Sequence, residues 1–140
     1  MLTSDLDTTR IAIIGPGRLG TAFAYKFGRD NKRVAIYYHD AEVCKAINRD
    51  HLNPLHLTED LAGRLGGMAK VPRLADKVYA TNDLEHIVEN NDFIVLTITM
   101  NRLPEFLNYL KPMIDKKAGD TCLISPIKGL ISDEISKELI

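Results

Sequence analysis

The fold of this chain follows from residues 10–20, which read Arg10-Ile11-Ala12-Ile13-Ile14-Gly15-Pro16-Gly17-Arg18-Leu19-Gly20. Arg10 to Ile14 is a short apolar run, typical of a buried strand that ends at Gly15. After the glycines, one apolar stripe recurs at the i, i+3, i+4 spacing of a helix face: Leu19, Ala22, Phe23 and Phe27. The stretch therefore predicts a strand, a tight turn and an amphipathic helix, in that order.

The turn fits the pattern Gly-x-Gly-x-x-Gly, which between a strand and a helix is a dinucleotide-binding fingerprint. Gly15 permits the tight turn, Gly17 lets the backbone approach a pyrophosphate, and Gly20 lets the helix pack close to the strand. Arg18 and Leu19 stand at the helix N-terminus, whose N–H groups and dipole attract phosphates. These five residues are candidate cofactor contacts. The alternative is a tight strand-to-helix turn without a ligand.

Asp40 follows the second predicted strand, Arg33 to Tyr38, about 20 residues after the turn, where the fingerprint has an acidic residue. Its carboxylate can accept hydrogen bonds from the adenosine ribose 2′-OH and would repel a 2′-phosphate, which favours NAD. His39 and Arg18 could instead offer charge or donors to a 2′-phosphate, so NADP stays open. His39 and Asp40 are thus further candidate cofactor residues. Asp40 can also be an N-cap for a helix that begins at Ala41, which is compatible with cofactor binding.

The alternation of strands and helices continues along the chain. Apolar runs predict further strands at Val78 to Ala80, Phe93 to Ile98 and Thr121 to Ser125. Apolar stripes predict further helices at Ala41 to Arg49, around Leu84 to Val88, at Leu103 to Ile114 and at Ser132 to Leu139. This order predicts a doubly wound, Rossmann-like α/β fold, with a mostly parallel sheet of about five strands and helices on both faces.

Three local features add detail to this single domain, which we expect to span residues 1–140. Residues 51–77 contain several prolines and glycines, so we expect an irregular insertion there with a short helix at Leu57 to Leu65. Asn82 and Glu85 have the spacing of a capping pair. Pro112 is expected to kink or shorten the far end of its helix.

The composition is that of a soluble globular protein, with 45% hydrophobic residues, 26% charged residues and a formal net charge of -1. This balance gives no general attraction to nucleic acid or acidic membranes. No apolar run approaches the roughly 20 residues that span a bilayer, and residues 1–10 lack a secretory pattern, so we expect a cytoplasmic protein. Cys44 and Cys122 are expected to be buried and reduced. The histidines are too scattered to predict a metal site.

Lys128 belongs to the sequence Ser125-Pro126-Ile127-Lys128-Gly129, directly after the fifth predicted strand. Ligands of doubly wound folds bind at the carboxyl edge of the sheet, where this loop is expected to lie. A lysine there can neutralise a phosphate of the substrate or approach the nicotinamide. The alternative is a solvated loop lysine.

The chain resembles the N-terminal domain of NAD(P)-dependent glycerol-3-phosphate dehydrogenase over nearly its whole length. The similarity is carried by the run from Ile11 to Ala24, by Tyr38-His39-Asp40, Ile47-Asn48 and Asn53-Pro54, by Ala80 to Leu84, and by Ile127-Lys128-Gly129. The sequence departs from the family at Arg18 and Leu19, where the family has a small polar residue and an aromatic one. It also departs at Thr99, where proline is common, and at Arg102, near a usual aromatic.

The resemblance implies an oxidoreductase that transfers a hydride between NAD(P)H and dihydroxyacetone phosphate, giving sn-glycerol 3-phosphate. It also implies that Lys128 contacts both the cofactor and the phosphorylated substrate. In the family, a helical C-terminal domain carries the groups that polarise the carbonyl and donate the proton. We therefore expect no catalytic residue within these 140 residues. The sequence leaves undecided whether the protein forms a homodimer. Two alternative functions also remain: a domain of a related dehydrogenase that acts on 2-hydroxy or 2-keto compounds, and a nucleotide-binding module without catalysis.

Overall fold

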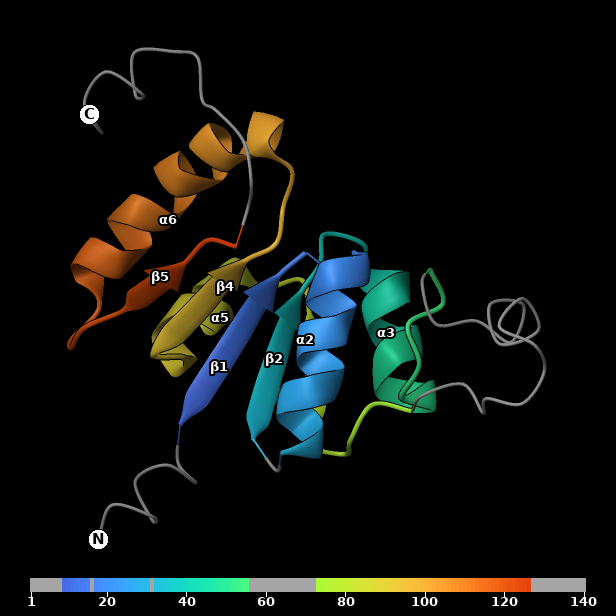
Figure 1. Ribbon diagram of the computed structural model, residues 1–140. Helices are drawn as coiled ribbons and strands as arrows, with labels where there is room; N and C mark the ends of the chain where they lie inside the picture. Colours follow the sequence, from blue (N-terminus) through green and yellow to red (C-terminus); the bar gives the residue numbers. More distant parts are fainter. Residues whose placement is uncertain (1–8, 16, 31, 56–72, 127–140) are drawn as a thin grey trace, which may run out of the picture.

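The computed structural model describes residues 9–15, 17–30, 32–55 and 73–126 (Figure 1). Within these residues the strands form one sheet in the order β3-β2-β1-β4-β5, and each neighbouring pair is parallel. The strands are β1 (Arg10–Ile14), β2 (Arg33–Tyr37), β3 (Val78–Thr81), β4 (Phe93–Leu96) and β5 (Cys122–Ile124). The predicted doubly wound α/β fold is therefore confirmed, and its sheet is parallel throughout the described strands.

Helices cover both faces of the sheet. Successive strand residues point to opposite sides, so apolar strands present an apolar face on each side that a helix buries. The helices are α2 (Arg18–Arg29), α3 (Ala41–Asp50), α5 (Leu84–Asn90) and α6 (Leu103–Lys116), with a 3₁₀ turn at Met100–Arg102. Ile13 of β1 packs on the face shared with α2 and α3, whereas Ala12 and Ile14 pack on the face shared with α5 and α6. All three are fully buried, as expected for a strand near the middle of a parallel sheet.

The predicted cap of α5 was wrong, and of the two effects expected of Pro112, a kink or a shorter helix, the shorter helix was wrong. Asp83 rather than Asn82 is the N-cap of α5, since its side chain accepts a hydrogen bond from the backbone N–H of His86 at 3.1 Å. Helix α6 is not shortened at Pro112 but continues to Lys116. Pro112 and Asn108 are both exposed, so the carbonyl left without its usual helical donor belongs to a solvent-facing residue.

The cysteines lie in different surroundings. Cys44 is buried on the inner side of α3, and desolvation by burial raises the pKa of its thiol. Cys122 was expected to be buried but is exposed, because β5 is the last strand at its edge of the described sheet. Both are free thiols.

The ends of the predicted insertion at residues 51–77 are held together. His51 closes α3 in the left-handed conformation, with a φ of 55°. Its carbonyl accepts a hydrogen bond of 2.7 Å from the backbone N–H of Leu74, shortly before β3. The two described ends of the insertion therefore lie side by side, between the end of α3 and the start of β3. The helices predicted at Leu57 to Leu65 and Ser132 to Leu139 lie outside the described residues.

Candidate functional site

The strand order places a topological switch point between β1 and β4. The chain runs outward from β1 to β2 and β3, then crosses back to β4 on the other side of β1. The loops that follow β1 and β4 therefore leave in opposite directions, which opens a crevice at the carboxyl ends of these two strands. Ligands of open α/β sheets bind in such a crevice. The predicted glycine turn follows β1 and lies there.

A cavity of about 240 Å³ occupies this position. The ends of three adjacent strands supply most of its wall: Gly15 and Gly17 after β1, Tyr38 after β2, and Thr97, Ile98 and Thr99 after β4. Leu55 and Arg102 are the other described residues of the lining. The cavity therefore brings two of the predicted glycines together with residues that are distant in the sequence.

Gly15 and Gly20 are required by the shape of the turn. Gly15 has a φ of +103°, which residues with a side chain rarely adopt, and a Cβ there would lie 3.1 Å from the carbonyl oxygen of Thr97. A Cβ on Gly20 would overlap the carbonyl oxygen of Gly15 and lie 2.6 Å from Oγ1 of Thr97. Gly20 therefore allows α2 to approach β1 and β4 closely, as its place in the motif predicts.

Gly17 differs from Gly15 and Gly20, because a Cβ at position 17 would meet no other atom within 4 Å. Packing within the described protein therefore does not require a glycine at this position. Gly17 is the N-cap of α2 and offers no side-chain cap for its first N–H groups. Open space beside an uncapped helix N-terminus fits the close approach of a phosphate group to the backbone.

Thr97 holds the glycine turn in place from β4. Its hydroxyl donates to the carbonyl oxygens of Ile14 at 3.0 Å and Gly15 at 2.8 Å, while its backbone N–H donates to Ile14 at 3.0 Å. On the opposite side, the N–H of Gly15 donates to the carbonyl of Tyr37 in β2. The turn is thus fixed by both strands that flank β1.

The remaining predicted cofactor residues that the structure describes are not among the cavity-lining residues. Arg18 and Leu19 occupy the first turn of α2 and are exposed, Leu19 by 47%. Oδ1 of Asp40 accepts hydrogen bonds from the N–H groups of Glu42 at 2.9 Å and Val43 at 3.4 Å, so Asp40 is the N-cap of α3. His39 is exposed, and its ring lies 4.4 Å from that of Tyr38. Lys128 lies outside the described residues.

Asn53 connects the wall of the cavity to α2. It is fully buried, and its side-chain amide donates to Oγ1 of Thr21 at 2.8 Å. Its side-chain oxygen accepts from the N–H of Leu55 at 2.9 Å, and Leu55 lines the cavity. The asparagine thus fixes the start of the insertion against the helix that begins at the glycine turn.

We expect the substitution Asn53→Ala to lower the free energy of unfolding by about 1–3 kcal/mol, since it leaves buried groups without their partners. Urea denaturation followed by circular dichroism measures this change. Asn82→Ala is the control: Asn82 is exposed and does not cap α5, so the loss should stay within about 0.5 kcal/mol. Equal losses in the two variants would contradict the role assigned to Asn53.

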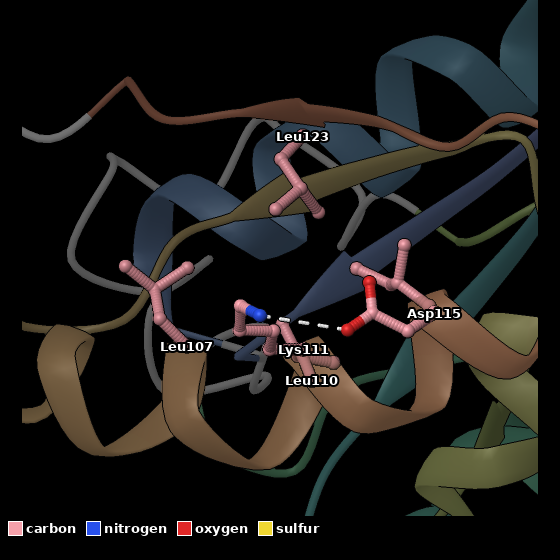
Figure 2. Close-up of a pocket in the computed structure, with 6 residues that line it drawn as sticks. Leu107, Leu110, Lys111, Asp115 and Leu123 are labelled. Atoms are coloured by element: carbon pink, nitrogen blue, oxygen red, sulfur yellow. Dashed lines mark ion pairs between the residues drawn. The ribbon is translucent and has the colours of Figure 1, made fainter.

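A larger cavity, of about 310 Å³, lies between α6 and the edge strand β5. Figure 2 shows Leu107 and Leu110 of α6 facing Leu123 of β5, with Lys111 and Asp115 joined by an ion pair of 3.5 Å. Among the described residues of its lining, the only charged side chains are these two, and the others are apolar. Within the described part of the chain, no cluster of three potential metal ligands occurs. None of the described helices is long and apolar enough to cross a bilayer.

A family profile described as the N-terminus of NAD-dependent glycerol-3-phosphate dehydrogenase matches residues 10–140. The chain belongs to this family. Glycerol-3-phosphate dehydrogenase (NAD(P)+) of Xanthomonas campestris is 27% identical over 136 residues, covering 95% of this chain and 36% of that relative. The resemblance deduced from the sequence is therefore confirmed at the level of the family.

Solved structures show the same fold. Glycerol-3-phosphate dehydrogenase from Coxiella burnetii superposes with a TM-score of 0.71 at 20% identity, over 90% of this chain and 34% of that one. The enzyme from Plasmodium falciparum gives a TM-score of 0.68 at 22% identity, over 95% of this chain and 36% of that one. The chain thus spans about a third of the length of the relatives that it matches.

Sequence reasoning missed part of the site. Neither the contacts of Thr97 nor the positions of Tyr38, Leu55 and Arg102 in the cavity wall were predicted. A signal for Thr97 was available, because it directly follows the apolar run of β4, where a parallel strand delivers its next residue to the ligand edge. No pattern in the sequence pointed to Leu55, since its position depends on the long-range contact of Asn53 with Thr21.

Proposed function

We propose that this chain is the cofactor-binding domain of an oxidoreductase that transfers a hydride between NAD(P)H and dihydroxyacetone phosphate or sn-glycerol 3-phosphate. One observation carries the proposal. In this chain, which belongs to the family, the glycine turn lies at the switch point and leaves free space at Gly17 beside the N-terminus of α2. The nicotinamide, when bound, supplies or accepts the hydride. The choice of dihydroxyacetone phosphate as the substrate rests on membership of the family, not on the shape of the cavity.

The chain's own residues bind and orient the dinucleotide. The backbone at Gly17 and the first N–H groups of α2 would hold the pyrophosphate, with Arg18 and Leu19 exposed beside it. Asp40 would accept from the adenosine ribose; its capping contacts use Oδ1, and among the described residues none is made by Oδ2. This arrangement favours NAD, while His39 beside Asp40 leaves NADP as the second candidate.

Lys128 completes the proposal on the substrate side. It follows β5 by a few residues, so the chain would reach the carboxyl edge of the sheet near its position. There its ammonium group would neutralise the substrate phosphate and contact the cofactor. The relatives are about three times as long as this chain, and we place the groups that donate the proton in the additional length.

Two measurements on the 140-residue chain test this function. Titration calorimetry with NADH and NADPH should show saturable binding, with NADH the tighter ligand if Asp40 decides the preference. A spectrophotometric assay with NADH and dihydroxyacetone phosphate should show negligible turnover. Absence of binding for both dinucleotides at millimolar concentration would favour a module that has lost the cofactor. Substantial turnover would contradict the placement of the proton donor outside this chain.

A further inference from the structure

Arg102 ends the 3₁₀ turn after β4 and is the N-cap residue of α6, at the rim of the cavity that also contains Gly15 and Gly17. The cavity has a volume of about 240 Å³, so a ligand inside it cannot lie far from either the glycine turn or Arg102. The arginine therefore belongs to the ligand side of the sheet, although it is more than eighty positions from the glycines in the sequence.

The charge of Arg102 is not neutralised within the described residues. Two other described arginines form ion pairs with carboxylates: Arg10 with Asp92 at 3.1 Å and Arg49 with Asp50 at 2.8 Å. Arg102 has no ion pair in the described structure, and Glu105 in the first turn of α6 does not form one with it. Its guanidinium instead lies 5.8 Å from the centroid of the Phe106 ring.

Arg102 is also poorly placed for the stability of α6. A cation at a helix N-terminus opposes the helix dipole, which costs about 0.3–1 kcal/mol, and Arg102 makes no side-chain capping bond in return. Residues that break such local rules are expected mainly at functional positions. The charge is also felt at the end of β2: burial raises the pKa of Tyr37, and the positive charge of Arg102 opposes that rise.

We infer that Arg102 is a binding residue for the pyrophosphate of the dinucleotide, opposite the backbone of Gly17. The planar guanidinium can donate two parallel hydrogen bonds to phosphate oxygens, and the Phe106 ring supports one of its faces. This inference rests on the proposed function and adds to it a side chain that supplies positive charge to the site. A lysine could supply the charge but not the bidentate geometry.

The test compares ligand affinity in the 140-residue chain and its variants by calorimetry. Arg102→Met should weaken binding of both NADH and ADP-ribose about tenfold, the effect of losing a charge-assisted contact. The variant should also show a weaker dependence of affinity on salt. Arg102→Lys should retain the salt dependence and recover part of the affinity. Adenosine, which has no phosphate, should bind equally well to all variants.

Arg29→Met is the matched control. Arg29 is exposed at the opposite end of α2, about 16 Å from the glycine turn along the helix, and its removal should leave affinity unchanged. Unchanged ADP-ribose affinity in Arg102→Met would overturn the inference while leaving the proposed function intact. A loss of adenosine binding as large as that of ADP-ribose would also overturn it, because the arginine would then contact the base. Failure of the unaltered chain to bind any dinucleotide would remove the proposed function and this inference together.

Discussion

Replacing Gly20 with alanine is expected to lower the free energy of unfolding by about 3 kcal/mol, the upper part of the range for overpacked sites. The added methyl group would overlap the carbonyl oxygen of Gly15 and lie 2.6 Å from Oγ1 of Thr97. Gly15 cannot move away easily, because hydrogen bonds from Thr97 and to Tyr37 hold it from both neighbouring strands. Native domains have a free energy of unfolding of only about 5–15 kcal/mol, so this single methyl group would remove a large fraction of that free energy.

Urea denaturation at equilibrium measures this effect, with Gly17→Ala as the control. A Cβ on Gly17 meets nothing within 4 Å and its φ of -69° suits alanine, so the control should stay within about 0.5 kcal/mol of the parent. If Gly20→Ala unfolds at the same urea concentration as Gly17→Ala, the close approach of α2 to the two strands is not what requires glycine at position 20.

Gly17→Asp is expected to reduce NADH affinity at least about 100-fold while leaving the fold intact. The side chain enters open space, so it meets no protein atom. It would place a carboxylate where a phosphate should lie, and two like charges about 4 Å apart repel by several kcal/mol near a protein surface. Calorimetry gives the affinity, and the urea midpoint reports whether the fold has changed.

Gly17→Asn separates charge from volume in this experiment, since asparagine has nearly the same size as aspartate without its charge. We expect the asparagine variant to bind NADH more tightly than the aspartate variant. Equal NADH affinity in the parent and in Gly17→Asp, with both folded, would show that the pyrophosphate does not approach Gly17 and would count against the proposed function.

Most of the fold could be predicted because its signals are local. The apolar run of β1 was assigned to Arg10–Ile14, as observed, and the periodicity of α3 gave its start at Ala41. Predictions failed where a residue's role depends on its place in the finished sheet. Cys122 looks like a buried strand residue, but β5 is the outermost strand of the described sheet, with Leu123 and Ile124 exposed by 39% and 43%.

The candidate site could be predicted only in part, for the same physical reason. The glycine motif is contiguous, so its turn was found from spacing alone. Thr97 and Arg102 reach the turn only because β4 lies beside β1, a pairing between residues about eighty positions apart. Asp83 and Asn82 are neighbouring residues of similar capping propensity, and the backbone geometry of the finished helix selects Asp83.

The hydrogen bonds of Thr97 have a consequence for how this site can change during evolution. The shape of the turn is determined by the close packing of Gly15, Gly20 and Thr97 and by hydrogen bonds to the neighbouring strands, and none of these contacts involves the exposed side chains of Arg18 and Leu19. The shape of the turn and the chemistry on its surface therefore depend on different residues. Mutations at positions 18 and 19 can alter which ligand is held, and how tightly, without disturbing the backbone that receives it.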